Sequence, residues 1–306
     1  MKIGTFTSIA CDPFGLEKGL DILAEAGYES VAYNLPPLNN PGIFAEEDAA
    51  IVAHYAKIRE EIEKRHFVIA QTHAPAPTIS EERDNHMVFE MLRKALLASA
   101  VLGAPYVIVH PNVLGVKEDG SFVHCLYDRN KESCKALNMD VFSRLIPYLE
   151  EYDTRIAIEN IWIRDHSRKD YVICPTACSD PYELAEYIDT LNAMCPSGDR
   201  FVACLDVGHA NITCRGISIR KVVNVLGPRL KALHVHDNDG LQDQHTAPGL
   251  GTVDWEDFCL GLRDIGYDGD FTLEDSYYRK FDTELIPAQM RFLYQIARHL
   301  CEKYDL

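Results

Sequence analysis

The chain has 306 residues, of which 47% are hydrophobic and 25% are charged. This ordinary globular composition excludes disordered, collagen-like and coiled-coil proteins. The net charge of −17, from 30 lysines and arginines against 47 aspartates and glutamates, disfavours nucleic acid and anionic membranes as partners, because both attract clustered positive charge.

Short β-rich segments alternate with amphipathic segments along the whole chain. Several β-rich segments, such as residues 107–109 and 156–158, are apolar on both faces, which is typical of parallel strands covered by helices. The expected strands are residues 2–8, 29–33, 67–73, 105–110, 155–160, 201–206, 230–235 and 270–274. The expected helices are residues 15–27, 45–65, 81–103, 131–152, 180–194, 216–227, 255–266 and 284–302.

Strict alternation of these strands and helices predicts an α/β fold, a (β/α)8 TIM barrel, with one domain spanning residues 1–306. An open doubly wound sheet is the alternative, but no Gly-x-Gly-x-x-Gly motif follows the first strand. The longer connections follow strands and would gather at the C-terminal face of the barrel, where active sites are built. They are residues 34–44, 111–130, 161–179 and 236–254.

Ten cysteines are spread along the chain without a Cys-x-x-Cys pair, and the first residues resemble a strand rather than an export signal. No apolar run approaches the length of about 18 residues that a membrane-spanning helix needs. We therefore expect a cytoplasmic protein with reduced thiols that does not enter a membrane. Cys174 and Cys178 are the one close pair, and an ordinary loop is favoured there over a zinc site.

Six consecutive predicted strands end in an imidazole or a carboxylate. These residues are His73, His110, Glu159, Asp206, His234 and Glu274. The strand ends of a barrel converge on one axis, and so many polar groups are costly to desolvate together unless they bind something. A single histidine or aspartate there has an ordinary structural explanation, but six in succession do not. We therefore predict a divalent metal site at the barrel mouth.

Three further candidates follow these strands. His209 stands three residues after Asp206, and Asp243 and His245 lie on the connection after the seventh strand. They fit two roles equally well: metal ligands, or groups that bind a substrate hydroxyl and stabilise a long loop. Asp237 is a candidate for orienting a metal ligand from behind.

Other features of the connections are less specific. Trp162 and Trp255 could wall a pocket, although packing is the commoner role of such aromatic residues. The backbone N–H groups of Gly249 and Gly251 could meet an anion. The basic residues Arg164, His166, Arg168 and Lys169 fit either a phosphate site or a solvated loop face.

The sequence resembles the xylose-isomerase-like barrel superfamily, which contains sugar and sugar-phosphate isomerases and epimerases together with endonuclease IV. The resemblance covers nearly the whole chain. It rests on Ile158-Glu159-Asn160, on Asp206-Val207-Gly208-His209, and on the segment from Leu233 to Trp255, which ends in Gly-x-Gly-x-x-Asp-Trp.

In the isomerase and epimerase branch, the resemblance implies one divalent ion, zinc or manganese, that binds two oxygens of a sugar or sugar phosphate. Its ligands would be Glu159, Asp206, His234 and Glu274. Glu159 and Glu274 would also act as acid and base on the C–H next to the carbonyl. His209 would hold a substrate oxygen. Apart from the resemblance, Trp162 is a candidate for contacting the substrate because of its place after the fifth strand. Gly240 stands where the free-ketose 3-epimerases have an arginine, which counts against that particular activity.

The endonuclease IV branch implies three zinc ions on the same frame. His73, His110 and Glu159 would surround the first ion. Glu159 would bridge to the second ion, which Asp206, His234 and Glu274 would also hold. His209, Asp243 and His245 would surround the third.

A zinc phosphodiesterase that cuts DNA at abasic sites is therefore the alternative function. The acidic charge of the chain and the absence of Lys or Arg from residues 34–44 count against it. A barrel that binds a sugar without converting it is the third hypothesis. The sequence leaves open whether the chain forms a homo-oligomer.

Overall fold

Eight parallel strands form one sheet in the computed structural model, which describes residues 1–37, 40–75, 85–113, 131–165, 169–170, 172–274 and 282–306. In spatial order, the strands are β10 (Phe271–Leu273), β1 (Ile3–Phe6), β2 (Ser30–Asn34), β3 (Val68–His73), β4 (Tyr106–Val109), β5 (Arg155–Glu159), β8 (Phe201–Asp206) and β9 (Leu230–His234). Val235 N–H donates to Thr272 O at 2.9 Å, and Glu274 N–H donates to Val235 O at 3.0 Å. These two bonds join the last strands and close the barrel, so the predicted fold class is confirmed.

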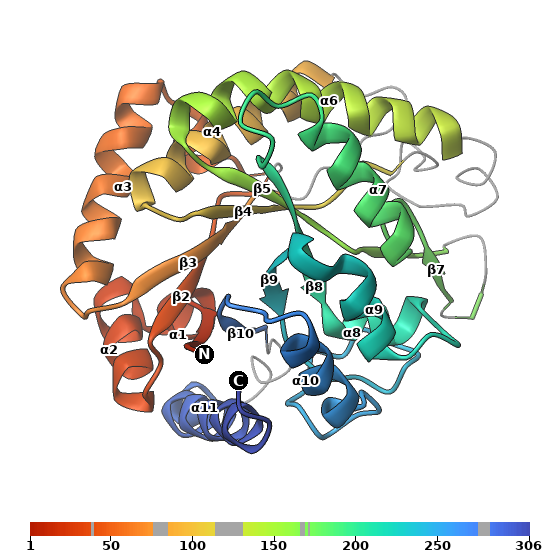
Figure 1. The fold of residues 1–306 in the computed structure, drawn as a ribbon. Coiled ribbons are helices and arrows are strands. Elements are labelled where there is room, and N and C mark those ends of the chain that lie inside the picture. Colours follow the sequence, from red (N-terminus) through yellow and green to blue (C-terminus); the bar gives the residue numbers. More distant parts are fainter. Residues whose placement is uncertain (38–39, 76–84, 114–130, 166–168, 171, 275–281) are drawn as a thin grey trace.

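Helices surround the barrel on its outside (Figure 1). They are α2 (Leu16–Ala26), α3 (Asp48–Glu63), α4 (Asn85–Leu102), α6 (Lys131–Tyr152), α7 (Pro181–Asn192), α9 (Ile219–Leu226), α10 (Trp255–Asp264) and α11 (Ile286–Lys303). Each matches a predicted helix, although residues 81–84 of the predicted helix 81–103 lie outside the described residues. No helix in the described part of the chain has the length and apolar character needed to cross a membrane.

The structure adds elements that the sequence did not predict. Two short helices, α1 (Ser8–Phe14) and α8 (Val207–Thr213), directly follow barrel strands. Within the predicted loop 161–179, β6 (Trp162–Arg164) pairs antiparallel with β7 (Ile173–Pro175). The 3-10 helices η1 (Gly42–Ala45), η2 (Gly227–Arg229) and η4 (Thr283–Leu285) are also present. All are too short for a hydrophobic period to be recognised in the sequence.

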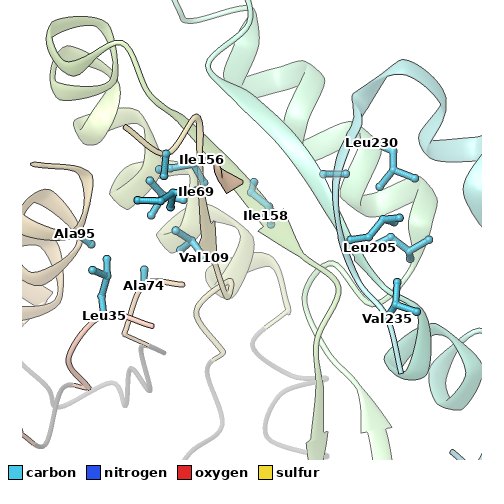
Figure 2. Close-up of a cluster of buried hydrophobic side chains, with 14 of the residues drawn as sticks. Leu35, Ile69, Ala74, Ala95, Val109, Ile156, Ile158, Leu205, Leu230 and Val235 are labelled. Carbon is cyan, nitrogen blue, oxygen red and sulfur yellow. The ribbon is translucent and has the colours of Figure 1, made fainter. Parts of the chain in front are cut away.

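Buried side chains form two cores that lie on opposite faces of the strands. The larger core fills the space between the barrel and its helices, and Figure 2 shows part of it, including Val109, Ile156 and Ile158. The smaller core lies apart from it and consists of Ile108, Ala157, Val202, Cys204 and Ala232. Successive side chains of a strand alternate between its two faces, so this second set faces the barrel axis.

That alternation decides where the polar strand ends point. Glu159 stands two residues after Ala157, and His234 stands two residues after Ala232. Residues two apart on a strand share a face. The polar side chains at the strand ends therefore form the top layer of the barrel interior, above a floor of small apolar groups.

Candidate metal centre

Glu159 lies at the centre of the polar layer, and its side chain is only 1% exposed. Its Oε2 atom is 3.4 Å from His73 Nε2 and 3.0 Å from His110 Nε2. Its Oε1 atom is 3.2 Å from His234 Nδ1. The two oxygens of one carboxylate thus face two different groups of histidines.

Glu274 approaches the same histidine from the end of β10. Its Oε2 atom is 2.9 Å from His234 Nδ1, and its side chain is 24% exposed. Glu159, Asp206, His234 and Glu274 each offer one ligand atom within 4.8 Å of the others, as do His73, Glu159 and His234. These groups could hold a metal ion, so the structure brings together all six residues that end the predicted strands.

Asp206 ends β8 and also begins helix α8. Its Oδ1 atom accepts the backbone N–H of His209 at 2.7 Å, which is a helix N-cap. Asn160 holds Asp206 from the neighbouring strand, because its side chain bonds both the N–H and the C=O of Asp206. The sequence also favoured a loop after this strand, but His209 lies in the first turn of helix α8.

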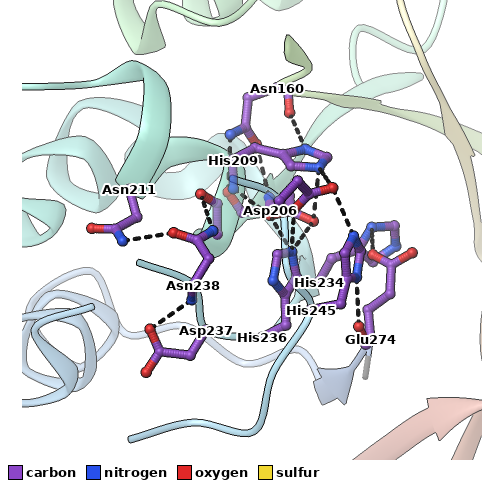
Figure 3. A network of polar contacts seen from close by, with 12 residues as sticks. Asn160, Asp206, His209, Asn211, His234, His236, Asp237, Asn238, His245 and Glu274 are labelled. Carbon is purple, nitrogen blue, oxygen red and sulfur yellow. Dashed lines mark hydrogen bonds and ion pairs between the residues drawn. The ribbon is translucent and has the colours of Figure 1, made fainter. Parts of the chain in front are cut away.

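A second cluster of residues that could hold a metal ion lies beside the first (Figure 3). It consists of His209, His236, Asp243 and His245, whose ligand atoms also lie within 4.8 Å of one another. Three of these residues were predicted from the sequence, and His236 was not. The ring of Trp162 stands nearly perpendicular to that of His209, with 6.2 Å between the ring centroids. Its contact with a substrate stays a prediction.

Backbone carbonyls orient three of the predicted ligand histidines. The Nδ1 atoms of His73, His209 and His245 lie 2.8, 2.9 and 2.7 Å from the carbonyl oxygens of Ala74, Asn160 and Glu274, respectively. A carbonyl only accepts, so each Nδ1 carries a hydrogen and each Nε2 atom is the nitrogen that could bind a cation. Histidines that bind metal in proteins are commonly oriented in this way.

The charges of the site suit a cation as well. Burial opposes protonation of His209, but the carboxylates of Asp206 and Asp243 outweigh it and raise its pKa to about 10. For His245 the balance is similar, and Asp243 and Glu274 raise its pKa to about 9. Burial opposes ionisation of Glu274, but the imidazole of His234 lowers its pKa below the ordinary value. Without a metal, the cluster therefore keeps protons that a divalent ion would replace.

Unpaired buried atoms give a test of this fit. His234 Nε2, His236 Nδ1 and Asp243 Oδ1 are all buried, and none has a hydrogen-bond partner among the described residues. A buried polar atom without a partner costs free energy, commonly about 1–3 kcal/mol. Carboxylates and imidazoles are the ligands of zinc and manganese, so the donor set fits a divalent metal.

The metal-free protein should lose stability as the pH rises. The ordinary pKa of histidine is about 6.5, and those of His209 and His245 in the folded chain are about 10 and about 9. Because the folded values are higher, their contribution is complete below about pH 6.5 and is lost as the pH rises through the folded values. Thermal unfolding at pH 6, 8 and 10 should show Tm falling, and bound metal should reduce the fall. A Tm that stays constant would contradict this charge arrangement.

The role predicted for Asp237, orienting a metal ligand, is not what its contacts show. Its side chain is buried and accepts four hydrogen bonds, from the backbone N–H groups of Asn238, Gly249 and Val253 and from Trp255 Nε1. The anion that meets Gly249 is therefore this internal carboxylate. Through these hydrogen bonds Asp237, at the beginning of the connection after β9, holds Gly249, Val253 and Trp255 at its far end.

Replacing Asp237 by Asn should lower the free energy of unfolding by about 2–4 kcal/mol, because an amide turns its own N–H groups toward donors. Chemical denaturation measures this loss. Asp140→Asn is the matched control, since that side chain is 63% exposed, and it should change stability by less than about 0.5 kcal/mol. Equal effects of the two substitutions would show that the four bonds contribute no net stability.

For Cys174 and Cys178 the sequence favoured an ordinary loop over a zinc site, and the structure places Cys174 in strand β7. Both cysteines are buried, and neither belongs to a possible metal-binding group within the described residues. Of the basic residues after β5, His166 and Arg168 lie outside the described residues.

Comparisons with known proteins agree with this fold. A family model described as xylose isomerase-like TIM barrel matches residues 20–296. The uncharacterised protein MJ1311 of Methanocaldococcus jannaschii is 26% identical over 223 residues, which cover 72% of this chain and 68% of that protein.

Two solved structures illustrate the similarity in fold. The 3-keto-D-glucoside 4-epimerase YcjR from E. coli has a TM-score of 0.70 at 15% identity, with 96% of this chain and 99% of that chain covered. The IolI protein, solved with a zinc atom, has a TM-score of 0.69 at 18% identity, with 99% of both chains covered. The chain belongs to the xylose isomerase-like TIM-barrel family.

Proposed function

We propose that the protein is a metal-dependent isomerase or epimerase of a sugar or sugar phosphate. The observation that carries the proposal is the pair of carboxylates that both approach one nitrogen of His234. His234 Nδ1 lies 3.2 Å from Glu159 Oε1 and 2.9 Å from Glu274 Oε2. Two carboxylates at one metal-binding position can both remove and return a proton.

The metal would be held by Glu159, Asp206, His234 and Glu274. Three carboxylates and one imidazole suit manganese or zinc better than calcium. When bound, a divalent ion polarises a carbonyl and so lowers the pKa of the neighbouring C–H.

The proposed reaction is a proton transfer at carbon. One carboxylate takes the proton from the carbon next to the sugar carbonyl, and the electron pair of that C–H bond moves toward the carbonyl oxygen. The other carboxylate returns a proton to the opposite face of the same carbon, or to the former carbonyl carbon. In the second case the hydroxyl proton of the first carbon also moves to the former carbonyl oxygen, so that the first carbon becomes the new carbonyl. The first outcome is an epimer and the second an isomer. Neither changes the formula of the sugar, so no oxidant or reductant is needed.

Three observations support a small sugar as the substrate. YcjR, which has the same fold, is named as an epimerase of a sugar derivative. The net charge of −17 disfavours a polyanion. Glu274 is 24% exposed, so one of the two carboxylates is accessible from solvent.

Deuterium exchange tests the reaction without knowledge of the product. The metal-loaded protein is incubated in D2O with a panel of ketoses and ketose phosphates, and the sugars are examined by mass spectrometry and NMR. We expect one member of the panel to take up deuterium at the carbon next to its carbonyl. No uptake by any member, with folded and metal-loaded protein, would contradict the proposal.

A zinc phosphodiesterase is the second candidate, and one observation favours it. Glu159 turns one oxygen toward His73 and His110 and the other toward His234, an arrangement in which one carboxylate can bridge two ions. Several ions together suit phosphoryl transfer, because they stabilise the attacking and the leaving oxygen. Cleavage of a duplex with an abasic site by the zinc-loaded protein, without deuterium exchange into any sugar, would favour this candidate.

A further inference from the structure

The carboxylate of Asp206 depends on the protein for its hydrogen bonds, because its side chain is 0% exposed. The backbone N–H of His209 donates one bond, to Oδ1 at 2.7 Å. The ring of the same residue lies farther away, with Nε2 3.6 Å from Oδ2, which is beyond hydrogen-bond distance. A single bond to one oxygen leaves the carboxylate free to rotate about Cβ–Cγ, so another donor is needed to fix its plane.

His236 supplies this second donor. Its Nε2 atom lies 3.0 Å from Oδ1 and 3.1 Å from Oδ2 of Asp206, and these contacts are among the dashed lines in Figure 3. An ionised carboxylate only accepts hydrogen bonds, so Nε2 carries the hydrogen and directs it between the two oxygens. Nearly equal distances to both oxygens fix the plane of the carboxylate, which the bond from the backbone does not do.

The ring of His236 is itself held in place on both faces, and its side chain is 0% exposed. A Cβ atom at Gly208 would lie 2.0 Å from Cε1 of His236, so any larger residue there would displace the ring. On its other face the ring stacks on His245, with the centroids 3.9 Å apart and the planes at 11°. Nearly parallel rings direct their nitrogens along separate lines, so His236 is placed to hold Asp206 rather than to share an ion with His245.

We propose that His236 is a positioning residue that fixes the carboxylate of Asp206 for the metal. The inference rests on the function proposed above, because it takes Asp206 as a ligand of that metal. A ligand that is already oriented binds an ion more tightly than one that must first be ordered. The orienting role that the sequence suggested for Asp237 therefore belongs to the residue before it.

A purely structural role for His236 must be distinguished from this one. The ring fills the space between Gly208 and His245, so its loss could act through packing alone. Glutamine places an amide N–H near the position of Nε2, whereas leucine fills the space without a donor. A positioning role predicts that these two variants differ, and a packing role predicts that they behave alike.

The first experiment titrates metal-free protein with manganese and measures the free ion by electron paramagnetic resonance. We expect His236→Leu to weaken manganese binding by about 10- to 100-fold, the usual cost of losing a partner that orients a ligand. His236→Gln keeps a donor and should stay within about 3-fold of the wild type. Equal losses in the two variants, or no loss in His236→Leu, would overturn the proposal.

The control for this titration is His299→Leu. Its side chain is exposed on the last helix, so its replacement should leave manganese binding unchanged. Thermal unfolding of each metal-free variant shows that the protein compared is folded.

A second measurement uses the wild-type protein without manganese. Long-range ¹H–¹⁵N NMR spectra show which nitrogen of a histidine carries the hydrogen, and the signals of His236 are those missing from His236→Gln. We expect the hydrogen on Nε2, both in metal-free protein and after zinc is added. A hydrogen on Nδ1, or loss of the Nε2 hydrogen when zinc binds, overturns the proposal. Neither measurement uses turnover, so the role of His236 and the proposed reaction succeed or fail separately.

Discussion

Replacing Glu159 by Gln should lower turnover of the sugar by at least about 10⁴-fold while the barrel stays folded. General acid–base groups contribute about 10²- to 10⁴-fold to rate, and this carboxylate is in addition a proposed metal ligand with contacts to His73, His110 and His234. Glutamine has nearly the same volume, so packing in the barrel interior should be kept. Turnover is measured with saturating metal, and folding by circular dichroism.

The control for Glu159→Gln is Glu302→Gln, which changes an exposed residue of the last helix and should keep full turnover. Sugar affinity, measured by calorimetry, separates the remaining hypotheses. If Glu159→Gln keeps more than a tenth of the wild-type turnover, Glu159 is not the acid or base. If the wild type binds a sugar without converting it and the variant binds it equally well, the protein is a binding barrel.

Removing bound metal with a chelator should abolish turnover and lower Tm by about 10 °C. An ion present at about 1,000 times its dissociation constant stabilises the folded chain by about 4 kcal/mol, and about 1 kcal/mol corresponds to about 2–4 °C in a protein of this size. The carboxylates and imidazoles that the ion had paired are then left facing each other. Scanning calorimetry measures the shift.

Adding metal back gives the control for chelation. Zinc or manganese should restore both Tm and turnover, whereas calcium should restore little, because imidazole is a poor ligand for calcium. If the chelator changes neither quantity, and elemental analysis shows that metal has left the protein, the strand-end residues do not form a functional metal site.

The positions of the polar residues at the strand ends were predictable from two regular features of a parallel barrel. Parallel strands of a barrel end at one face, and alternate residues point inward, so His73, Glu159 and His234 had to meet if the barrel prediction was right. His236 continues the alternation of Ala232 and His234 beyond the end of the strand. That period of two was the signal for the one member of the second cluster that the sequence analysis did not include.

Other features depend on contacts that no local pattern encodes. Helix α8 has seven residues and includes Gly208, so its sequence carries no clear helical period. The β6–β7 hairpin is held partly from outside, because the side chains of Thr176 and Ser179 both bond the carbonyl of Ile161. The four bonds to Asp237 likewise join residues up to 18 positions apart in sequence. Such contacts become visible only in the folded chain.

Asp206 links helix α8 to the candidate metal site. One of its oxygens caps α8 through the amide of His209, while the same carboxylate belongs to the proposed metal site. A helix of seven residues depends strongly on its cap, since short helices are marginal on their own. Hydrogen exchange at the amide of His209 should therefore be slower in the metal-bound protein than in the metal-free protein. The exchange rate of this one amide would then measure how much metal is bound, even for an ion without a spectroscopic signal of its own.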